Sequence, residues 1–306
     1  MYDLVIIGGG PAGVAAGVYA ARKRLKTLLV TETFGGQSID SLGIQNWIGT
    51  VNIPGPDLAK ELEKHLRTYA GDSVDIKTGL RVEKIEKKEK GFGVKVGGET
   101  FETKTILITS GSSRRKLEIP GAKEFENKGI TYCASCDGPL FSDQEVVVIG
   151  GGNAGFETAA QLLAYAKSVT LLQRSEKYKA DEMTVEKVLS HPNMKGLLNT
   201  ELKEIKGDKF VKSLIYRDAK TGKKHELPVT GVFVEIGLMP NTDFVKEFVP
   251  VNQYNQIVTD PKNQRTKVNG VWAAGDCTDT LYHQNNIAAG DAVRALEDIY
   301  LYLHAR

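Results

Sequence analysis

Cys133 and Cys136 are separated by two residues, a spacing that allows a disulfide to close within one helical turn. Such a pair can hold two electrons, and a helix N-terminus or a nearby cation lowers a thiol pKa enough for attack at neutral pH. Half a zinc site and two inert core thiols are the alternatives. Asp137 follows directly, and a carboxyl partly buried beside a thiolate has a raised pKa that suits general acid catalysis. Alternatively, Asp137 only caps a turn with Gly138.

Two similar glycine-rich turns flank this pair, and each follows an apolar run typical of a buried strand. Glycines at this spacing allow a tight turn, let a pyrophosphate approach the backbone and direct it to a helix N-terminus. Two such turns predict an electron donor and an acceptor, both dinucleotides. The predicted phosphate contacts are Gly8, Gly10, Pro11, Ala12 and Gly13 in the first turn, and Gly150, Gly152, Asn153, Ala154 and Gly155 in the second.

Glu32 lies about 20 residues beyond the first turn, where a carboxylate accepts hydrogen bonds from the hydroxyls of an adenosine ribose. With strand, helix and acid in place, the pattern favours dinucleotide binding. The alternative is a structural turn, with Glu32 merely solvated.

The two turns belong to a duplicated α/β pattern. The predicted units are strand 3–7, helix 13–23 and strand 27–32, then strand 145–149, helix 155–166 and strand 168–174. Both units continue into β-meanders (81–103 and 202–227) and close with apolar strands that reach glycine (105–111 and 231–237). The segment after Asn241, with a helix over 286–302, has no counterpart in the first half, and we expect it to complete the first module.

Length and composition narrow the class of protein. A chain of 306 residues favours two domains, and a net charge of +2 without long runs of one sign predicts neither a nucleic-acid nor a membrane partner. No apolar stretch approaches about 18 residues and the N-terminus enters a strand, so we expect a cytoplasmic protein. Scattered histidines predict no metal site. The single Cys277 is expected to be a small buried hydrophobe.

The motifs together resemble the low-molecular-weight thioredoxin reductases almost end to end. The resemblance rests on both glycine turns, on Cys133-Ala134-Ser135-Cys136-Asp137-Gly138-Pro139, and on Ala273-Ala274-Gly275-Asp276. The chain is also similar to the flavoprotein core of bacterial alkyl hydroperoxide reductases, in 131–133, 136–141 and 275–277. The thioredoxin-like domain of those reductases would then be a separate protein.

The resemblance implies two Rossmann-like, three-layer ββα domains, the second inserted into the first. Residues 1–115 and 243–306 would bind FAD, and 116–242 would bind NAD(P)H and carry the cysteine pair. Cys136 would face the flavin, Cys133 would attack the partner and Asp137 would donate a proton. A homodimer and a rotation of the two domains between steps are also implied. Further FAD contacts would be Gly35, Gly36, Gln37, Asn46, Ser110, Gly111, Gly275, Asp276 and Gln284.

The choice of nicotinamide cofactor depends on the segment that begins at Gln173. The resembled reductases show His-Arg-Arg and a later Arg, whereas this chain keeps Arg174, has Ser175 in place of the next arginine and has Lys179 at the last position. Losing one charge-assisted contact costs about 1.5 to 3 kcal/mol, roughly ten- to a hundredfold in affinity. A preference for NADPH should therefore be weakened but not abolished. Because Gln173 is uncharged and Arg174 and Lys179 remain, we expect NADPH, with NADH or dual use as the alternative.

The predicted function is electron transfer from NAD(P)H through FAD and the Cys133–Cys136 disulfide to thioredoxin or a thioredoxin-like protein. One alternative is an NADH-dependent reductase of a peroxiredoxin system with a separate thioredoxin- or glutaredoxin-like partner. A ferredoxin-dependent reductase should lack the intact turn at Gly150–Gly155. A dinucleotide-sensing regulator without turnover is a further alternative.

Overall fold

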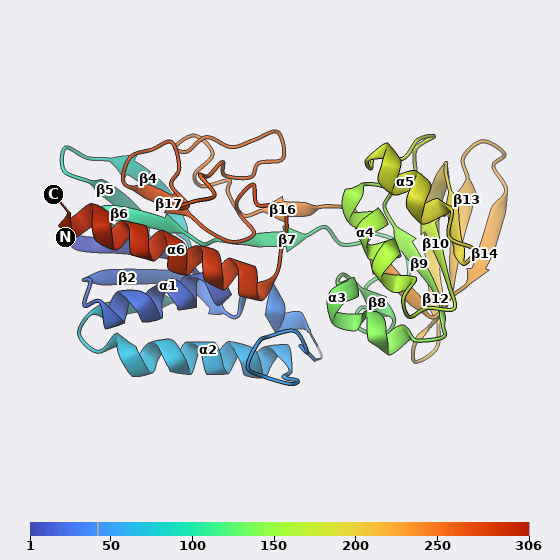
Figure 1. Ribbon diagram of the computed structural model, residues 1–306, viewed down its shortest axis with the longest axis horizontal. Coiled ribbons are helices and arrows are strands. Elements are labelled where there is room, and N and C mark those ends of the chain that lie inside the picture. Colours follow the sequence, from blue (N-terminus) through green and yellow to red (C-terminus); the bar gives the residue numbers. More distant parts are fainter. Residues whose placement is uncertain (42, 306) are drawn as a thin grey trace. The chain divides into compact units, whose positions relative to one another are not determined.

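The computed structural model describes residues 1–41 and 43–305. It divides into two compact units, one formed by Met1–Ser113 with Met239–Arg306 and the other by Arg114–Leu238 (Figure 1). The second unit is thus inserted into the first. The division falls slightly ahead of the limits predicted near Arg115 and Asp243. The connecting segments form β7 (Ser112–Arg114) and β16 (Leu238–Pro240), which pair with each other.

The first unit is built on a parallel sheet with the order β3-β2-β1-β6, and β17 also pairs with β6. Helices α1, α2 and α6 lie together on one face (Figure 1), where their apolar side chains pack against Leu4 and Ile6. The bounds are β1 Tyr2–Gly9, β2 Thr27–Phe34, β3 Val74–Thr78, β6 Glu99–Ile108, β17 Val271–Ala273, α1 Pro11–Arg22, α2 Gly55–Ala70 and α6 Asn285–His304, with a short 3-10 helix at Gly36–Asp40.

The other face of this sheet is covered by β4 (Val82–Lys87) and β5 (Phe92–Val96), which continue antiparallel from β6. Val5 and Ile7 point into this second core layer. The unit therefore has three layers, as the sequence predicts. One expectation is wrong: 81–103 and 105–111 are not separate elements. β6 runs through both, because Thr103 is fully buried and pairs with β1 and β5 at once.

Two helices of the first unit differ from the sequence prediction, one in its start and one in not being predicted. α1 begins at Pro11 rather than Gly13, since the fixed φ of proline suits the first turn of a helix. α2 was not predicted, although Leu58, Leu62 and Leu66 recur at four-residue spacing and are buried.

The second unit repeats the architecture with the parallel order β11-β10-β9-β15-β8. Helices α3, α4 and α5 pack on one face, and the antiparallel sheet of β12, β13 and β14 packs on the other. The bounds are β8 Ile130–Thr131, α3 Ala134–Asp137, a 3-10 turn Gly138–Phe141, β9 Glu145–Ile149, α4 Asn153–Leu162, β10 Ser168–Leu172, α5 Glu182–Leu189, β11 Met194–Leu197, β12 Thr200–Gly207, β13 Val211–Asp218, β14 Lys224–Pro228 and β15 Gly231–Val234.

The predicted fold class, two Rossmann-like modules with the second inserted into the first, is confirmed. In the second unit α4 ends at Leu162 rather than 166, and β10 ends at Leu172 rather than 174.

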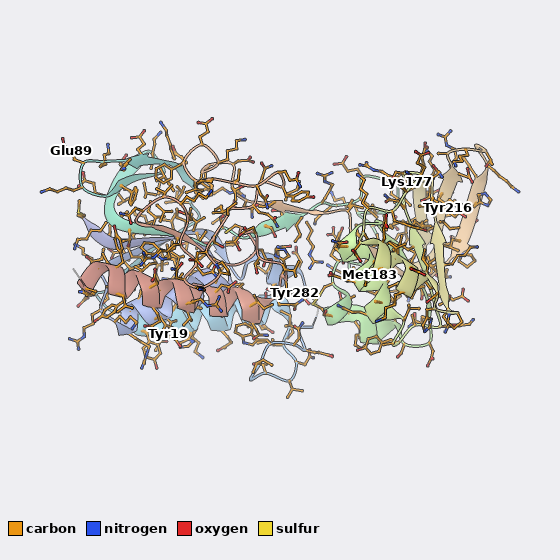
Figure 2. All side chains as sticks on the ribbon, turned by 45° about the horizontal axis from the view of Figure 1, so that its top comes forward. Tyr19, Glu89, Lys177, Met183, Tyr216 and Tyr282 are labelled. Carbon is orange, nitrogen blue, oxygen red and sulfur yellow. A yellow bond between two sulfur atoms is a disulfide. The ribbon has the colours of Figure 1, made fainter. Side chains whose placement is uncertain are left out.

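Large exposed side chains include Tyr19 and Tyr282 on the first unit and Met183 on the second (Figure 2).

Candidate functional site

The first glycine turn joins β1 to α1 with very little space. Gly8 has a φ of +120°, and a Cβ on Gly13 would lie 1.8 Å from the carbonyl oxygen of Gly8. Only glycine fits these two positions. Gly10 differs, because the atom nearest to a Cβ there would be the Cα of Gly36 at 3.8 Å. The turn thus leaves open the side from which a phosphate reaches the start of α1.

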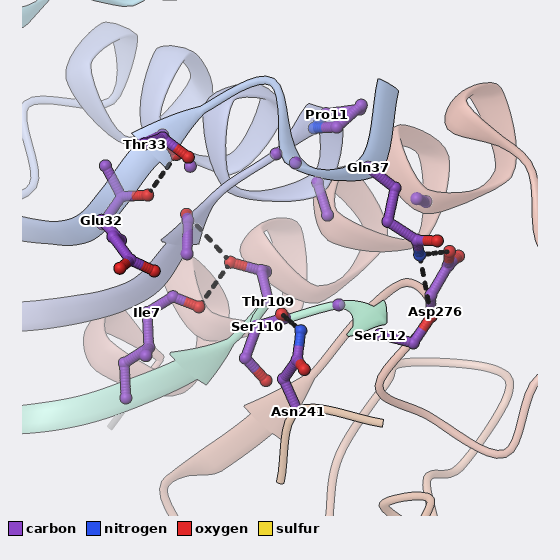
Figure 3. Close-up of a pocket in the computed structure, with 18 of the residues that line it drawn as sticks. Ile7, Pro11, Glu32, Thr33, Gln37, Thr109, Ser110, Ser112, Asn241 and Asp276 are labelled. Carbon is purple, nitrogen blue, oxygen red and sulfur yellow. Dashed lines mark hydrogen bonds between the residues drawn. The ribbon is translucent and has the colours of Figure 1, made fainter. Parts of the chain in front are cut away.

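A cavity of about 580 Å³ opens in front of this turn, within the first unit (Figure 3). At one end the side-chain amide of Gln37 donates to Ser112 Oγ at 2.9 Å and to Asp276 Oδ2 at 3.4 Å. Ten of the predicted FAD contacts line the cavity: Gly8, Gly10, Pro11, Ala12, Glu32, Gly36, Gln37, Ser110, Gly111 and Asp276.

Glu32 lies at the cavity wall after β2 and is paired with a residue that the sequence analysis missed. Arg81 donates from Nε to Glu32 Oε2 at 2.7 Å, and both residues line the cavity. Glu32 is thus exposed but ion-paired, with its carboxylate at the wall of the cavity. The sequence signal was an arginine at the first position of the predicted meander.

Five predicted contacts do not line this cavity: Gly13, Gly35, Asn46, Gly275 and Gln284. Asn46 and Gln284 nevertheless lie together, because the Asn46 amide donates to Gln284 Oε1 at 3.2 Å. Asn286 donates to the carbonyl oxygen of Asn46 at 2.7 Å, which ties this loop to the start of α6. Beside them, His283 Nδ1 is 3.5 Å from Asp276 Oδ1.

The residues at this cavity fit a flavin dinucleotide. A Cβ on Gly10 would meet no atom closer than the Cα of Gly36 at 3.8 Å, so the turn has room for a pyrophosphate. The acid after β2 and the cavity volume agree with a dinucleotide ligand.

The second glycine turn reproduces the geometry of the first. Gly150 has a φ of +122°, and a Cβ on Gly155 would lie 1.8 Å from the Gly150 carbonyl oxygen. A Cβ on Gly152 would meet nothing within 4 Å. This turn also leaves the approach to a helix open, at Asn153 and Ala154, the first residues of α4. The duplication seen in the sequence is therefore a duplication of local geometry.

The segment after β10 is fixed against this turn by hydrogen bonds. Gln173 accepts from the Gly151 amide at 3.1 Å, and the Lys179 amide donates to the Gly151 carbonyl at 2.7 Å. The side-chain amide of Gln173 donates a hydrogen bond to Ser175 Oγ at 2.6 Å, so the Ser175 hydroxyl is already hydrogen-bonded. Arg174 and Lys179 are exposed and have no ion pair in the part of the chain that the structure describes.

Cys133 and Cys136 are joined by a disulfide at the start of α3. Both are half-buried, and the Cys136 amide donates to Cys133 Sγ at 3.2 Å. An amide aimed at the sulfur stabilises a thiolate there when the bond opens.

Asp137 lies at the end of α3 and accepts a hydrogen bond from the Thr131 hydroxyl. Burial raises the pKa of this carboxyl, and the Thr131 hydrogen bond and the Arg114 guanidinium oppose that rise. The predicted direction of the shift is confirmed, and its cause is desolvation. The carboxyl therefore keeps its proton to a higher pH than an ordinary aspartic acid.

Glu235 is a second carboxyl in this region that the sequence analysis missed as a functional residue. It follows β15, is half-buried and accepts from the Thr158 hydroxyl at 2.8 Å. Burial raises its pKa as well. The available signal was an acidic residue directly after an apolar strand that reaches the carboxyl edge of a parallel sheet.

Cys277 is fully buried and has a free thiol, as expected. Burial raises its pKa to about 11, so it is a structural rather than a reactive thiol. Across residues 1–41 and 43–305, no helix has both the length and the apolar character needed to cross a bilayer.

Comparison with known proteins places this geometry in a family. A family model described as pyridine nucleotide-disulphide oxidoreductase matches residues 2–292. Among solved structures, the thioredoxin reductase of Streptococcus pyogenes MGAS5005 is 33% identical, with a TM-score of 0.90 over 100% of this chain and 99% of that one. The enzyme of Giardia duodenalis is 32% identical, with a TM-score of 0.93 and coverage of 99% and 98%. The resemblance to thioredoxin reductases is confirmed.

Curated relatives carry other names. A protein called NADH dehydrogenase from Bacillus subtilis (strain 168) is 40% identical over 302 residues, which is 99% of this chain and 58% of that protein. A component of the alkyl hydroperoxide reductase of Staphylococcus aureus (strain MRSA252) is 39% identical over 303 residues, 99% and 59% respectively. The chain thus spans somewhat over half the length of the curated relatives it matches.

Proposed function

The chain belongs to the pyridine nucleotide-disulphide oxidoreductase family, and on this premise we propose that it passes electrons from NAD(P)H, through FAD and the Cys133–Cys136 disulfide, to thioredoxin or a thioredoxin-like protein. The observation that supports this most directly is the repeated glycine turn, one in each unit, with a closed disulfide in the same unit as the second. Two dinucleotide sites and a dithiol are what such a transfer requires.

In this proposal the first unit binds FAD and the second binds the nicotinamide cofactor. FAD, when bound, would supply the redox chemistry that links a hydride donor to a disulfide, which accepts two electrons. Gly8, Gly10 and Gly13 shape the backbone for its pyrophosphate, and Glu32 accepts from its ribose. In the second unit Gly150, Gly152 and Gly155 have the corresponding role for the nicotinamide dinucleotide.

The protein groups around the disulfide then handle protons and charge. Cys133 is the sulfur that attacks the partner, because the Cys136 amide stabilises its thiolate. Asp137 is the general acid, since its raised pKa keeps a proton available at the site of thiolate formation.

Arg174 and Lys179 support a preference for NADPH, because both cations are exposed and unpaired in the described part of the chain. Ser175 does not compensate for the missing arginine, since it is bonded to Gln173. Arg174→Ser should therefore raise the KM for NADPH about tenfold or more and leave that for NADH within about twofold. Equal effects on both cofactors would show that Arg174 does not read the 2′-phosphate.

The second candidate is an NADH-dependent reductase of a peroxiredoxin system, with a separate thioredoxin- or glutaredoxin-like partner. It is favoured by the curated relatives, whose 39% to 40% identity exceeds the 32% to 33% identity to the two thioredoxin reductases. Turnover of purified thioredoxin, a glutaredoxin-like protein and a peroxiredoxin-system partner, each with NADPH and NADH, would separate the two candidates.

Anaerobic stopped-flow measurement is the direct test of the common proposal. NADPH or NADH should bleach the flavin absorbance, and full reduction of wild type should consume about four electrons per flavin, two of them stored in the disulfide. Cys136→Ser should consume about two. A wild type that stores only two electrons, or a flavin that neither nucleotide bleaches, would refute the assignment. The resemblance also supports a cytoplasmic homodimer, testable by sedimentation and cell fractionation.

A further inference from the structure

We propose that Glu235 is a second proton-holding residue of the Cys133–Cys136 pair, acting beside Asp137 and sharing Arg114 with it as a common cation. The inference rests on the proposed function in one respect, namely that the pair cycles between disulfide and dithiol.

Strand register brings Glu235 and Cys133 to the same edge of the sheet. β15 runs parallel to β8, with Phe233 opposite Thr131. Cys133 has an extended backbone (φ −142°, ψ 102°) and lies two residues beyond Thr131, as Glu235 lies two beyond Phe233. Both residues therefore follow the carboxyl ends of two paired parallel strands, which lie about 4.8 Å apart.

Helix α4 holds both the carboxyl and the redox segment. The Thr158 hydroxyl donates to Glu235 Oε1 at 2.8 Å. Three residues later on the same face, Gln161 accepts from Ser135, which lies between the two cysteines, at 2.9 Å. The same face of α4 is thus hydrogen-bonded both to Glu235 and to the segment between the two cysteines.

Two charged residues act on Glu235, one from β7 and one from α4. Arg114, on β7, favours the ionised form of Glu235 and likewise that of Asp137, so it lies within electrostatic reach of both. Its guanidinium is 6.0 Å from the ring centre of Tyr132, the residue before Cys133. Glu157 on α4 opposes ionisation of Glu235, as burial does. The same arginine therefore favours the charged form of two partly buried acids in the unit that carries the pair.

This arrangement matches the proton balance of disulfide reduction. Two electrons enter the Sγ–Sγ bond, the bond breaks, and the two sulfurs need two protons to become thiols. Asp137 supplies one proton, and Glu235 supplies the other to Cys133 Sγ, after which solvent reprotonates both carboxylates. In the reverse direction the dithiol gives its electron pair and two protons to the disulfide of the partner protein.

A charged Glu235 must also repel a thiolate on Cys133, so the two groups titrate together.

The test is the rate of iodoacetamide alkylation of the dithiothreitol-reduced holoenzyme between about pH 5.5 and 9.5. Glu235→Gln keeps an acceptor for Thr158 but removes the charge. The midpoint for Cys133 should fall by about one unit, which makes alkylation roughly tenfold faster at neutral pH. Glu186→Gln, an exposed carboxyl on α5, is the matched control and should not shift it.

A purely structural Glu235 gives a different result. If it only accepts from Thr158, the Glu235→Gln profile superimposes on that of wild type, and the proposal is overturned. Thr158→Val supplies independent support: losing the donor disfavours the charged carboxyl, so the midpoint should fall by less than in Glu235→Gln. When Thr158→Val is combined with Glu235→Gln, the midpoint should be the same as in Glu235→Gln alone. If Thr158→Val lowers the midpoint in the Glu235→Gln background as much as it does in wild type, the proposal is also overturned.

The chemical reductant separates this inference from the proposed function. Dithiothreitol opens the disulfide without nicotinamide or a partner protein. A shifted profile in an enzyme that NAD(P)H cannot reduce would leave Glu235 as a proton holder and refute the nicotinamide assignment. Unchanged melting temperature and bound flavin show that each variant is folded.

Discussion

Replacing Gly155 with alanine would place a Cβ 1.8 Å from the carbonyl oxygen of Gly150, inside the second nucleotide turn. The atom in the way is backbone, so no side-chain rotation relieves the overlap. Overpacking of this kind costs about 3 kcal/mol. Gly152→Ala is the matched variant, because its Cβ meets nothing within 4 Å. As the N-cap of α4 it should cost less than about 1 kcal/mol.

The two alanines should therefore separate folding from binding. Gly155→Ala should lower the unfolding midpoint of the second unit, measured by thermal melting with the flavin still in place. Gly152→Ala should melt close to wild type but raise the KM for NAD(P)H tenfold or more, about 1.4 kcal/mol, because the methyl group occupies the side from which the pyrophosphate approaches. A Gly155→Ala protein that melts like wild type would refute the packing argument. Unchanged nucleotide binding in Gly152→Ala would refute the position assigned to the phosphates.

Further outcomes follow from individual side chains. Asp137→Asn should slow turnover of a disulfide partner about a hundredfold while NAD(P)H still bleaches the flavin at the wild-type rate. In wild type the same step needs the protonated carboxyl, so its rate should fall as pH rises through the raised pKa of Asp137, and a pH-independent rate would exclude that role. Arg81→Gln should weaken FAD binding by at most about fivefold, because an exposed ion pair contributes roughly 0 to 1 kcal/mol. The affinity can be measured by ultrafiltration. A larger loss of affinity would mean that Arg81 contacts the ligand itself. With the disulfide closed, the native protein should show no titratable thiol at mildly alkaline pH, because burial raises the pKa of Cys277 to about 11. The denatured protein should show one titratable thiol, that of Cys277. Reaction of a thiol in the native protein would contradict the burial of Cys277.

The sequence was most informative where backbone chemistry has few solutions. Gly8, Gly13, Gly150 and Gly155 predicted both nucleotide turns because a Cβ at each has no room, and the α/β repeat followed from the strands around them. The return of the C-terminal segment to the first module was also predictable, since nothing in the first half corresponds to it.

The missed features depend on partners far away in the sequence. Arg81 meets Glu32 across 49 positions, and Thr158 meets Glu235 across 77. A local pattern contains no signal for such pairs, because sheet topology alone brings them together. The unbroken course of β6 was missed for the same reason: burial of Thr103 depends on strands that flank it on both sides.

The discontinuity of the first unit sets an order of events on the ribosome. β17 adds to β6, and α6 packs beside α1, yet both are synthesised after the whole of Arg114–Leu238. The inserted unit is contiguous and can fold as it emerges, whereas α1 must wait with part of its apolar face uncovered. Nascent chains stalled before Asn285 should therefore recruit chaperones through the N-terminal third of the protein, even when the inserted unit is already protease-resistant.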